Sequence, residues 1–372
     1  MDRLPRWADV ALVPFVSLTL AAIISALVII AIGQDPWEAI TVMVEGSVMN
    51  AYGWGYTLYY ATSFIFTGLA VTVAFHAGLF NIGGEGQAQV GGLGVALVCL
   101  ALPWPHWSVA LVAATFGAAV FGAAWAAVPA WLQAKRGSHI VITTIMFNAI
   151  AAALLNYLLV NVINLKGSMD TATAPFPATT HLPNLSDILG LIGIPFARTS
   201  PANIALIIAQ VAAVIVWAVI WRTRLGYELR AFGHSDSAAR YAGIDAFKIT
   251  MIVMLASGAL AGLLAINKVM GEGERLVMGA VEGAGFIGIA VALMGRNHPV
   301  GVVLASLLFG ALTQGGQILS QNQETAIPVE LVVVIQALVI MFTGALDNMV
   351  RAPLTRLFWM LRRPPAPGKA GD

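Results

Sequence analysis

The feature that most restricts the fold of this chain is a series of long apolar runs that carry almost no charge. Between Glu45 and Lys135 the sequence has no Lys or Arg, and Glu85 is the one acidic residue. A helix needs about 20 apolar residues to cross a bilayer. Over the whole chain 59% of residues are hydrophobic and 10% are charged, whereas a soluble domain carries about 25% charged residues. The sequence therefore predicts an all-α protein that crosses a membrane many times.

The apolar runs predict a helical bundle of about ten membrane spans. The first run is too long for the core of a cleaved signal peptide, so a retained helix is expected. The eighth run is too short to cross a membrane alone, so a short broken helix is expected there. The predicted spans are 10–33, 57–79, 83–102, 108–133, 138–161, 202–221, 249–269, 284–295, 299–319 and 327–346.

The basic residues predict the orientation, because Lys and Arg gather in the cytoplasmic loops of membrane proteins. With the N-terminus inside, about ten spans leave only Lys166, Arg198, Lys268 and Arg275 of the 19 basic residues outside. An odd number of spans would place the N-terminus or the basic tail on the wrong side. Both termini are therefore predicted to lie in the cytoplasm.

Residues 1–350 are predicted to form one transmembrane domain, followed by a cytoplasmic tail over 351–372. Residues 35–50 have the pattern of an amphipathic helix that lies on the outer surface. Residues 162–200 hold many Pro, Thr and Asn and predict an outer loop with a short helix near 185–192. The net charge is +1 and no basic run is present, so no nucleic-acid partner is expected.

One apolar region is interrupted by a polar, glycine-rich stretch, 75-FHAGLFNIGGEGQAQVGGLGV-95. Either this stretch contains a wet cytoplasmic turn between two spans, or its glycines break a helix near the middle of the membrane and its polar side chains line a substrate path. Burying Glu85 at that depth would cost roughly 2.5–3.5 kcal/mol. For Asn81 and Glu85 a structural role in caps and interhelical hydrogen bonds is favoured slightly, whereas both roles stay open for Gln87 and Gln89.

Two of the glycine-rich stretches show a weak internal sequence similarity. EGQAQVG, starting at Glu85, and EGAGFIG, starting at Glu282, share a Glu-Gly pair, three intervening residues, and an aliphatic residue followed by Gly. In the predicted topology the two stretches cross the membrane in opposite directions. Inverted repeats of this kind are common in transporters, where the pathway lies at the repeat interface. A chance likeness between helices rich in Gly and Ala is the alternative.

The inside loop 222–248 contains a predicted short helix. Ser235 or Asp236 can cap this helix at its start, and Gly243 would end it. With Gly233 and Gly243 on either side, the helix has a suitable shape to dock into a groove of another protein. An ordinary solvated loop is the alternative.

Two motifs resemble the membrane subunits of bacterial ABC importers. T-x-L-G-x-x-L-R-A-x-G-x-x-x-x-A-A-x-Y-A-G-I, from Thr223 to Ile244, is similar to the coupling region of permeases for branched-chain amino acids, simple sugars and nucleosides. G-L-F-N-I-G-x-E-G-Q, from Gly78 to Gln87, is similar to the nucleoside branch of that group. The resemblance covers about residues 10–350.

The resemblance implies a permease in the bacterial cytoplasmic membrane, surrounded by lipid, that imports a nucleoside. A separate extracytoplasmic binding protein would deliver the solute, a second, non-identical permease would complete a heterodimer, and a cytoplasmic ATPase would hydrolyse ATP. The sequence has no G-x-x-x-x-G-K-[ST] phosphate loop, in agreement with an ATPase on another chain. No enzymatic activity, metal or bound cofactor is expected. The residues expected to couple to the ATPase are Arg230, Gly233, Ser235, Asp236, Ala239, Arg240, Tyr241 and Gly243.

The remaining candidates for a substrate path are polar or aromatic residues in or beside the spans. Uncharged amides suit a nucleoside, and aromatic rings could stack on its base. The same amides also serve interhelical hydrogen bonds, which is the alternative for each of them. These candidates are Phe75, Phe80, Asn148, Gln314 and Gln317.

Three alternative functions stay open. The chain could be a permease for simple sugars or branched-chain amino acids, or an ion-coupled secondary transporter that works without an ATPase. A membrane-embedded enzyme is least favoured, because the sequence shows no paired acid and base and no metal-ligand spacing.

Overall fold

The computed structural model describes residues 5, 8, 12–165, 170–190, 193, 196–322, 327–342 and 352–355, and these are helical or irregular apart from two isolated β-bridges. The chain divides into two compact units, Met1–Ile40 with Leu319–Asp372 and Thr41–Ile318. Several predicted segments lie wholly or partly outside the described residues. They are most of 1–11, 166–169 of the outer loop, 343–346 of the last predicted span, and the tail apart from 352–355.

The first unit is built on α1 (Val13–Ala31) and α14 (Val329–Ile340), which pack against each other. After α1 the chain turns sharply at Gly33, whose positive φ of 83° suits glycine, and enters α2 (Pro36–Val48). The helix predicted over 35–50 is therefore confirmed. Both α2 and α13 (Pro299–Gln321) continue across the boundary between the units.

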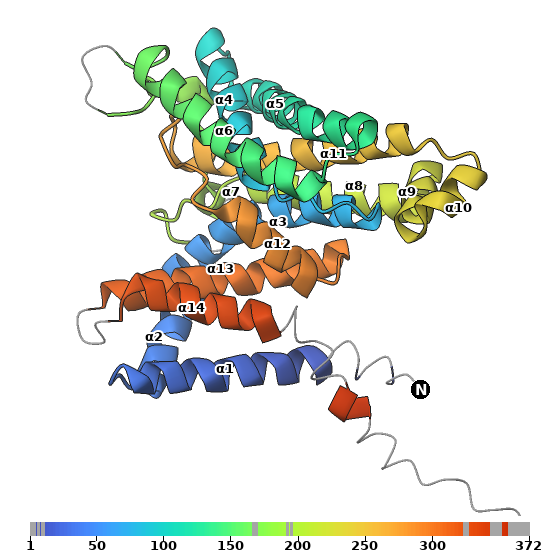
Figure 1. The fold of residues 1–372 in the computed structure, drawn as a ribbon. Coiled ribbons are helices and arrows are strands. Elements are labelled where there is room, and N and C mark those ends of the chain that lie inside the picture. The colour runs from blue at the N-terminus through green and yellow to red at the C-terminus, as the bar shows by residue number, and fades with distance from the viewer. Residues whose placement is uncertain are drawn as a thin grey trace, which may run out of the picture. The chain divides into compact units, whose positions relative to one another are not determined.

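The second unit contains the remaining helices (Figure 1). These are α3 (Ala51–His76), α4 (Gly84–Ala101), α5 (Trp107–Arg136), α6 (Ile140–Asn161), α7 (Leu185–Gly190), α8 (Ala205–Arg222), α9 (Arg224–His234), α10 (Asp236–Tyr241), α11 (Ala246–Ala265) and α12 (Ala284–Met294), with the short turns η2 (Ala178–Thr180) and η3 (Ile266–Glu272). Helices α4, α5 and α11 pack pairwise, and α3 packs against α8, α11 and α12.

Glycine allows the tight packing of α4, α5 and α11. A Cβ at Gly91 of α4 would clash with the backbone of Gly262 of α11, and a Cβ at Gly122 of α5 would clash with the backbone of Gly258. Small residues are favoured between membrane helices because they let backbones approach closely. Buried residues near this contact, which include Ala118, belong to a hydrophobic cluster of the unit.

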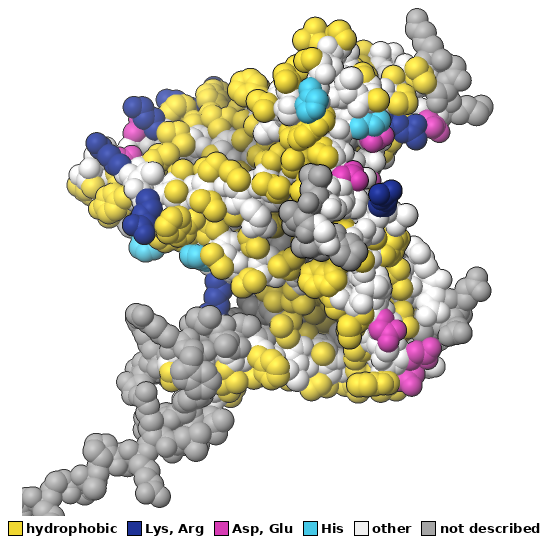
Figure 2. Space-filling model, turned by 180° about the vertical axis from the view of Figure 1, so that it is seen from behind, with side chains coloured by type: hydrophobic (Ala, Val, Ile, Leu, Met, Phe, Trp, Pro, Cys, Tyr) yellow, Lys and Arg dark blue, Asp and Glu magenta, His cyan; other side chains and the backbone are white. Residues whose placement is uncertain are grey.

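Within the described residues, six helices are long and apolar enough to cross a membrane, or seven if the bent pair α1 and α2 forms one span. The six are Ala51–His76, Trp107–Arg136, Ile140–Asn161, Ala205–Arg222, Ala246–Glu272 and Pro299–Gln321. The chain is therefore a multi-pass membrane protein. In Figure 2 hydrophobic side chains cover much of the visible surface of the second unit, and Lys and Arg gather at the end where α9 and α10 lie.

The other predicted spans correspond to α1, α4, α12 and the described part of α14. Helix α4 opens with the polar sequence GEGQAQVGG, so its apolar character is weaker than that of the six. The short helix predicted over 284–295 is α12, which has 11 residues. The short helix predicted near 185–192 is α7.

Candidate functional site

The helical structure is interrupted between α3 and α4 over residues 77–83, which we call the break. Buried amide side chains hold this segment in place. Asn81 is 1% exposed and donates hydrogen bonds from Nδ2 to Oε1 of Gln87 (2.8 Å) and Oγ of Ser257 (2.8 Å). Its Oδ1 accepts from the backbone N–H of Gly83 (2.9 Å) and from Nε2 of Gln87 (3.1 Å). The amide groups of Asn81 and Gln87 are thus used inside the protein, and their burial excludes the wet turn.

Helix α6 supports the same break through Asn148. Its Oδ1 accepts from the N–H of Gly86 (2.9 Å), and its Nδ2 donates to the carbonyl of Ile82 (2.9 Å). A Cβ at Gly86 would lie 2.9 Å from Cα of Asn148, so glycine is needed for this approach. One amide from α6 therefore satisfies two backbone groups at the start of α4, where the first N–H groups of a helix have no partner within the helix.

Glu85 binds the start of α12. Its two carboxylate oxygens accept from the N–H groups of Gly283 (3.1 Å) and Gly285 (3.0 Å). A carboxylate at a helix N-terminus satisfies free N–H groups and interacts favourably with the helix dipole. A Cβ at Gly285 would clash with the backbone of Glu85, so the first turns of α4 and α12 touch directly. The starts of α4 and α12 are also the two stretches that show the weak internal sequence similarity.

The other path candidates are separate from this network. The rings of Phe75 and Phe80 flank the break with their centroids 5.0 Å apart, and both side chains are half-buried. Gln314 is buried and Gln317 half-buried on α13. Within the described part of the chain, no hydrogen bond of Asn81, Glu85, Gln87 or Asn148 reaches α13.

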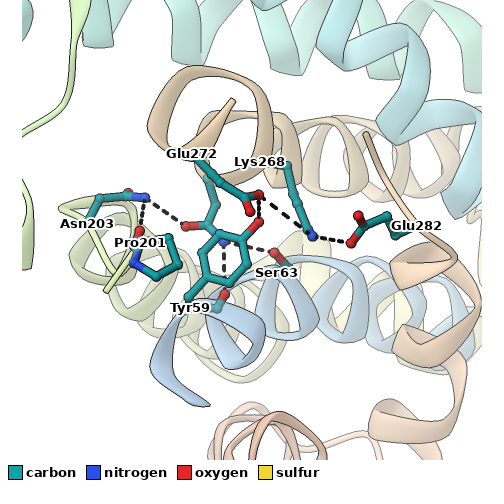
Figure 3. Close-up of polar contacts among 8 residues, drawn as sticks. Tyr59, Ser63, Pro201, Asn203, Lys268, Glu272 and Glu282 are labelled. Carbon is teal, nitrogen blue, oxygen red and sulfur yellow. Dashed lines mark hydrogen bonds and ion pairs between the residues drawn. The ribbon is translucent and has the colours of Figure 1, made fainter. Parts of the chain in front are cut away.

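A second polar cluster surrounds Lys268, and Figure 3 shows the side chains that converge on it. The Nζ atom lies 2.7 Å from Oε2 of Glu282 and 4.0 Å from Oε2 of Glu272. It also lies over the rings of Tyr59 and Tyr60, 4.9 and 5.5 Å from their centroids. The Tyr59 hydroxyl donates to the Glu272 carboxylate. We call Tyr59, Tyr60, Lys268, Glu272 and Glu282 the Lys268 cluster.

Asparagines fix the backbone beneath the Lys268 cluster (Figure 3). Asn267 donates from Nδ2 to the carbonyl of Tyr59 (2.9 Å) and to Oγ of Ser63 (2.9 Å), both on α3. Its Oδ1 accepts from Asn203, which also donates to the carbonyl of Pro201 (3.0 Å). These bonds join α3, η3 and the segment before α8, so the ends of three elements are held together.

The sequence argument placed Lys268 at the outer end of the span 249–269 and gave it no special role, whereas its side chain is 4% exposed. It lies in η3, a π-helical turn that continues α11, and such turns are frequent at functional sites. The signal in the sequence was an Asn-Lys pair inside an apolar run, where an unpaired ammonium is costly. Its partner Glu282 and the rings of Tyr59 and Tyr60 are distant in sequence, so the pairing itself could not be predicted.

The loop 222–248, which the sequence predicts to lie inside, folds into two short helices. Thr223 caps α9 by accepting from the N–H of Gly226 (3.1 Å), and Ser235 caps α10 by accepting from the N–H of Ala238 (3.3 Å). Gly243 follows α10 with a positive φ of 81°. The predicted short helix with a Ser235 cap and a glycine stop is therefore confirmed, whereas α9 was not predicted.

Helix α10 is exposed apart from one residue. Asp236 and Arg240 form an ion pair one turn apart, with Nε to Oδ1 at 2.8 Å. Ala239 is 3% exposed and anchors the helix, whereas the ring of Tyr241 is 95% exposed. Arg230 is half-buried on α9 and donates from Nε to the carbonyl of Gly226 (3.3 Å).

Helix α9 touches the end of α3. A Cβ at Gly233 would clash with the carbonyl of His76, and a Cβ at Gly78 would lie 3.4 Å from Cα of Gly233. The His76 ring stacks edge-on against Trp221 (5.1 Å), which in turn packs on the ring of His298 (5.0 Å). The inside loop is therefore in direct backbone contact with the chain that leads into the break.

Comparison with known proteins gives a family and close relatives. The family described as "Branched-chain amino acid transport system / permease component" matches residues 53–344. Guanosine ABC transporter permease protein NupP of Bacillus subtilis is 37% identical over 335 residues, 90% of this chain and 93% of that protein. Glucose ABC transporter permease protein TsgB13 of Haloferax volcanii is 35% identical over 344 residues, 91% of this chain and 88% of that protein. Guanosine ABC transporter permease protein NupQ of Bacillus subtilis is 29% identical over 262 residues, 68% and 78% of the two chains.

Proposed function

The chain belongs to the family of permease components of branched-chain amino acid transport systems, and we propose that it carries nucleosides as the permease of an ATP-driven importer. As an ABC importer permease it is not itself catalytic, so ATP is hydrolysed on a partner. The observation that carries the proposal is the likeness to a guanosine permease over nine-tenths of the chain, together with the Gly78–Gln87 motif.

Glucose is the second candidate substrate. TsgB13 is a glucose permease by name and resembles this chain almost as strongly as NupP does. Overall identity therefore does not separate the two solutes. The nucleoside is preferred because the stretch from Gly78 to Gln87 resembles the nucleoside branch of the family.

We propose a topology of about ten spans in the bacterial cytoplasmic membrane, with both termini inside. In this topology α4 and α12 are oppositely directed halves of an inverted repeat. The contact between Glu85 and the first turn of α12 supports this arrangement, because half-helix N-termini meet near the substrate site of many transporters.

Within this topology we assign two roles to the path candidates. Asn81, Glu85, Gln87 and Asn148 shape the path by fixing the break and the start of α12. Phe75, Phe80, Gln314 and Gln317 are the candidates for direct contact with the solute.

The partners proposed are a cytoplasmic ABC ATPase, an extracytoplasmic binding protein and a second permease. The names NupP and NupQ support a heterodimer, since both are guanosine permeases of one organism and both match this chain. The ATPase would bind α10 and the residues that flank it, Ser235–Gly243. Movement would pass from α9 through Gly233 to the end of α3.

Uptake measurements test the substrate. Cells that express the complete system are given labelled guanosine, uridine, glucose, ribose and leucine, each with active ATPase and with a catalytically dead ATPase. ATP-dependent uptake of the nucleosides above the other solutes is expected. Uptake that persists with the dead ATPase and stops when the ion gradients are collapsed would instead support a secondary transporter.

Tyr241→Ala tests the docking role of α10. Because the ring is almost fully exposed, its loss should leave thermal stability unchanged and weaken the association of the ATPase with the permease. Tyr157→Ala, at a 60% exposed position on α6, is the matched control. Equal ATPase affinity of Tyr241→Ala and the control, measured on purified complexes, would remove α10 from the interface.

A further inference from the structure

The Lys268 cluster holds a buried ammonium with spare hydrogen-bonding capacity. A Lys ammonium has three donors, and among the described residues Nζ makes one hydrogen bond, to Glu282 (2.7 Å). Glu272 lies at 4.0 Å, beyond hydrogen-bond distance. Burial of an ammonium is costly unless it is paired, so Lys268 holds the Glu282 carboxylate firmly.

The carboxylates of the cluster are accessible although the ammonium is not. The side chain of Glu282 is 66% exposed and that of Glu272 is 44% exposed, against 4% for Lys268. Glu282 has a positive φ of 52°, an uncommon conformation for a residue other than glycine. Such strain is found where a function depends on the side-chain position. In this conformation the carboxylate faces Lys268.

Aromatic rings border the same cluster. The centroids of Tyr59 and Tyr60 are 5.2 Å apart, those of Tyr56 and Tyr59 are 6.4 Å apart, and those of Tyr52 and Tyr56 are 4.8 Å apart. Tyr52, Tyr56 and Tyr60 follow one another at four-residue intervals along α3 and form an aromatic surface beside the charged groups, whereas Tyr59 itself is buried. A flat base or the C–H face of a sugar ring packs well on such a surface.

We propose that the Lys268 cluster is a binding site for neutral solutes that carry vicinal hydroxyl groups. The Glu282 and Glu272 carboxylates accept hydrogen bonds from the hydroxyls, and the buried Lys268 holds the Glu282 carboxylate in position. Ribose and glucose both carry such pairs of hydroxyls, so one site serves both candidate substrates. The inference rests on the proposed import function, and it identifies the vicinal hydroxyls as the part of the solute that the permease recognises.

The charge of the cluster sets its selectivity. Two carboxylates and one ammonium leave a formal charge of −1, so a solute with a phosphate or a lone carboxylate is repelled. Charge-assisted hydrogen bonds are stronger than neutral ones, so removal of the hydroxyls from the solute should lower its affinity. Glu282→Gln keeps the size of the side chain and an oxygen that can accept from Lys268, and it removes the charge.

Competition experiments with the complete transporter in vesicles test this site. Labelled guanosine competes with unlabelled guanosine, 2′,3′-dideoxyguanosine, guanosine 5′-monophosphate and leucine in wild type, Glu282→Gln and Glu272→Gln. Glu274→Gln is the matched control, because Glu274 is 45% exposed, is close in sequence and pairs with His181 instead. The same binding protein is present with every variant, so a change in selectivity between variants belongs to the permease.

In wild type the dideoxy compound should compete roughly tenfold or more weakly than guanosine, as expected for lost bonds to charged groups. Glu282→Gln and Glu272→Gln should bring the inhibition constants of guanosine and the dideoxy compound closer together, and they should let the monophosphate compete. Glu274→Gln should change neither result. An unchanged ratio in both variants, or competition by leucine that depends on Glu282, would overturn the site. If guanosine is not imported, the nucleoside proposal fails, and glucose against 2-deoxyglucose tests the site in the same variants.

Discussion

Replacing Asn81 by Ala separates a structural role for the break from a role in substrate contact. The side chain makes four hydrogen bonds, to Gln87 twice, to Ser257 and to the N–H of Gly83. Side-chain hydrogen bonds within membrane proteins contribute about 0.6 kcal/mol each on average, which gives about 2.4 kcal/mol for four. The buried N–H of Gly83 would also lose its partner, at a cost of about 1–3 kcal/mol. We therefore expect Asn81→Ala to lower the free energy of unfolding by about 3–5 kcal/mol.

Thermal unfolding of the purified complex in detergent measures this loss. One kcal/mol corresponds to roughly 2–4 °C for domains of 150–250 residues, so a fall in Tm of at least about 6 °C is expected. Gln89→Ala is the matched control. Gln89 lies on α4, and its side-chain oxygen has no hydrogen-bond partner among the described residues. The apparent KM for uptake by the surviving Asn81→Ala protein should stay near that of wild type. An unchanged Tm together with a raised KM would refute the structural role and favour direct contact.

Two further predictions concern the contacts on either side of the break. Glu85→Gln removes the negative charge at the first turn of α12, so we expect a loss of about 0.3–2 kcal/mol, read as a lower Tm; a Tm equal to that of wild type would show that the two N–H bonds do not need the charge. Gly233→Ala brings a Cβ against the His76 carbonyl and should reduce uptake per ATP hydrolysed in reconstituted vesicles. Gly190→Ala, at a site with open space around the Cβ and no positive φ, should leave coupling unchanged, and equal coupling in the two variants would contradict transmission through α9.

Local signals in the sequence were sufficient for the apolar helices and for the cap and stop of α10. Uninterrupted apolar runs have one stable state in a bilayer, and Ser235 and Gly243 act on neighbouring backbone groups. Helix α3 begins at Ala51, earlier than predicted, because its cap, Asn50, lies outside the apolar run. Helix α9 was read as loop because its charged residues alternate with few apolar ones.

The site was only partly predictable because its contacts join distant parts of the chain. The sequence identified Asn81, Glu85 and Gln87 as unusual, since polar groups in apolar surroundings require partners. It could not identify those partners, such as Ser257, or place Lys268 inside the protein. These depend on how α3, α11 and α12 pack, and no local pattern specifies that packing.

The glycine contacts between α4, α5 and α11 also limit how the protein can move. Where side chains interlock, neighbouring helices can shift by changing rotamers, but backbone atoms already in contact have no such freedom. These three helices are therefore expected to move as one unit. Helix α12 belongs with them, because Gly285 lies against the backbone of Glu85 and the Glu85 carboxylate accepts from the N–H groups of Gly283 and Gly285. In the proposed importer, alternating access then comes from elements outside this group of four helices.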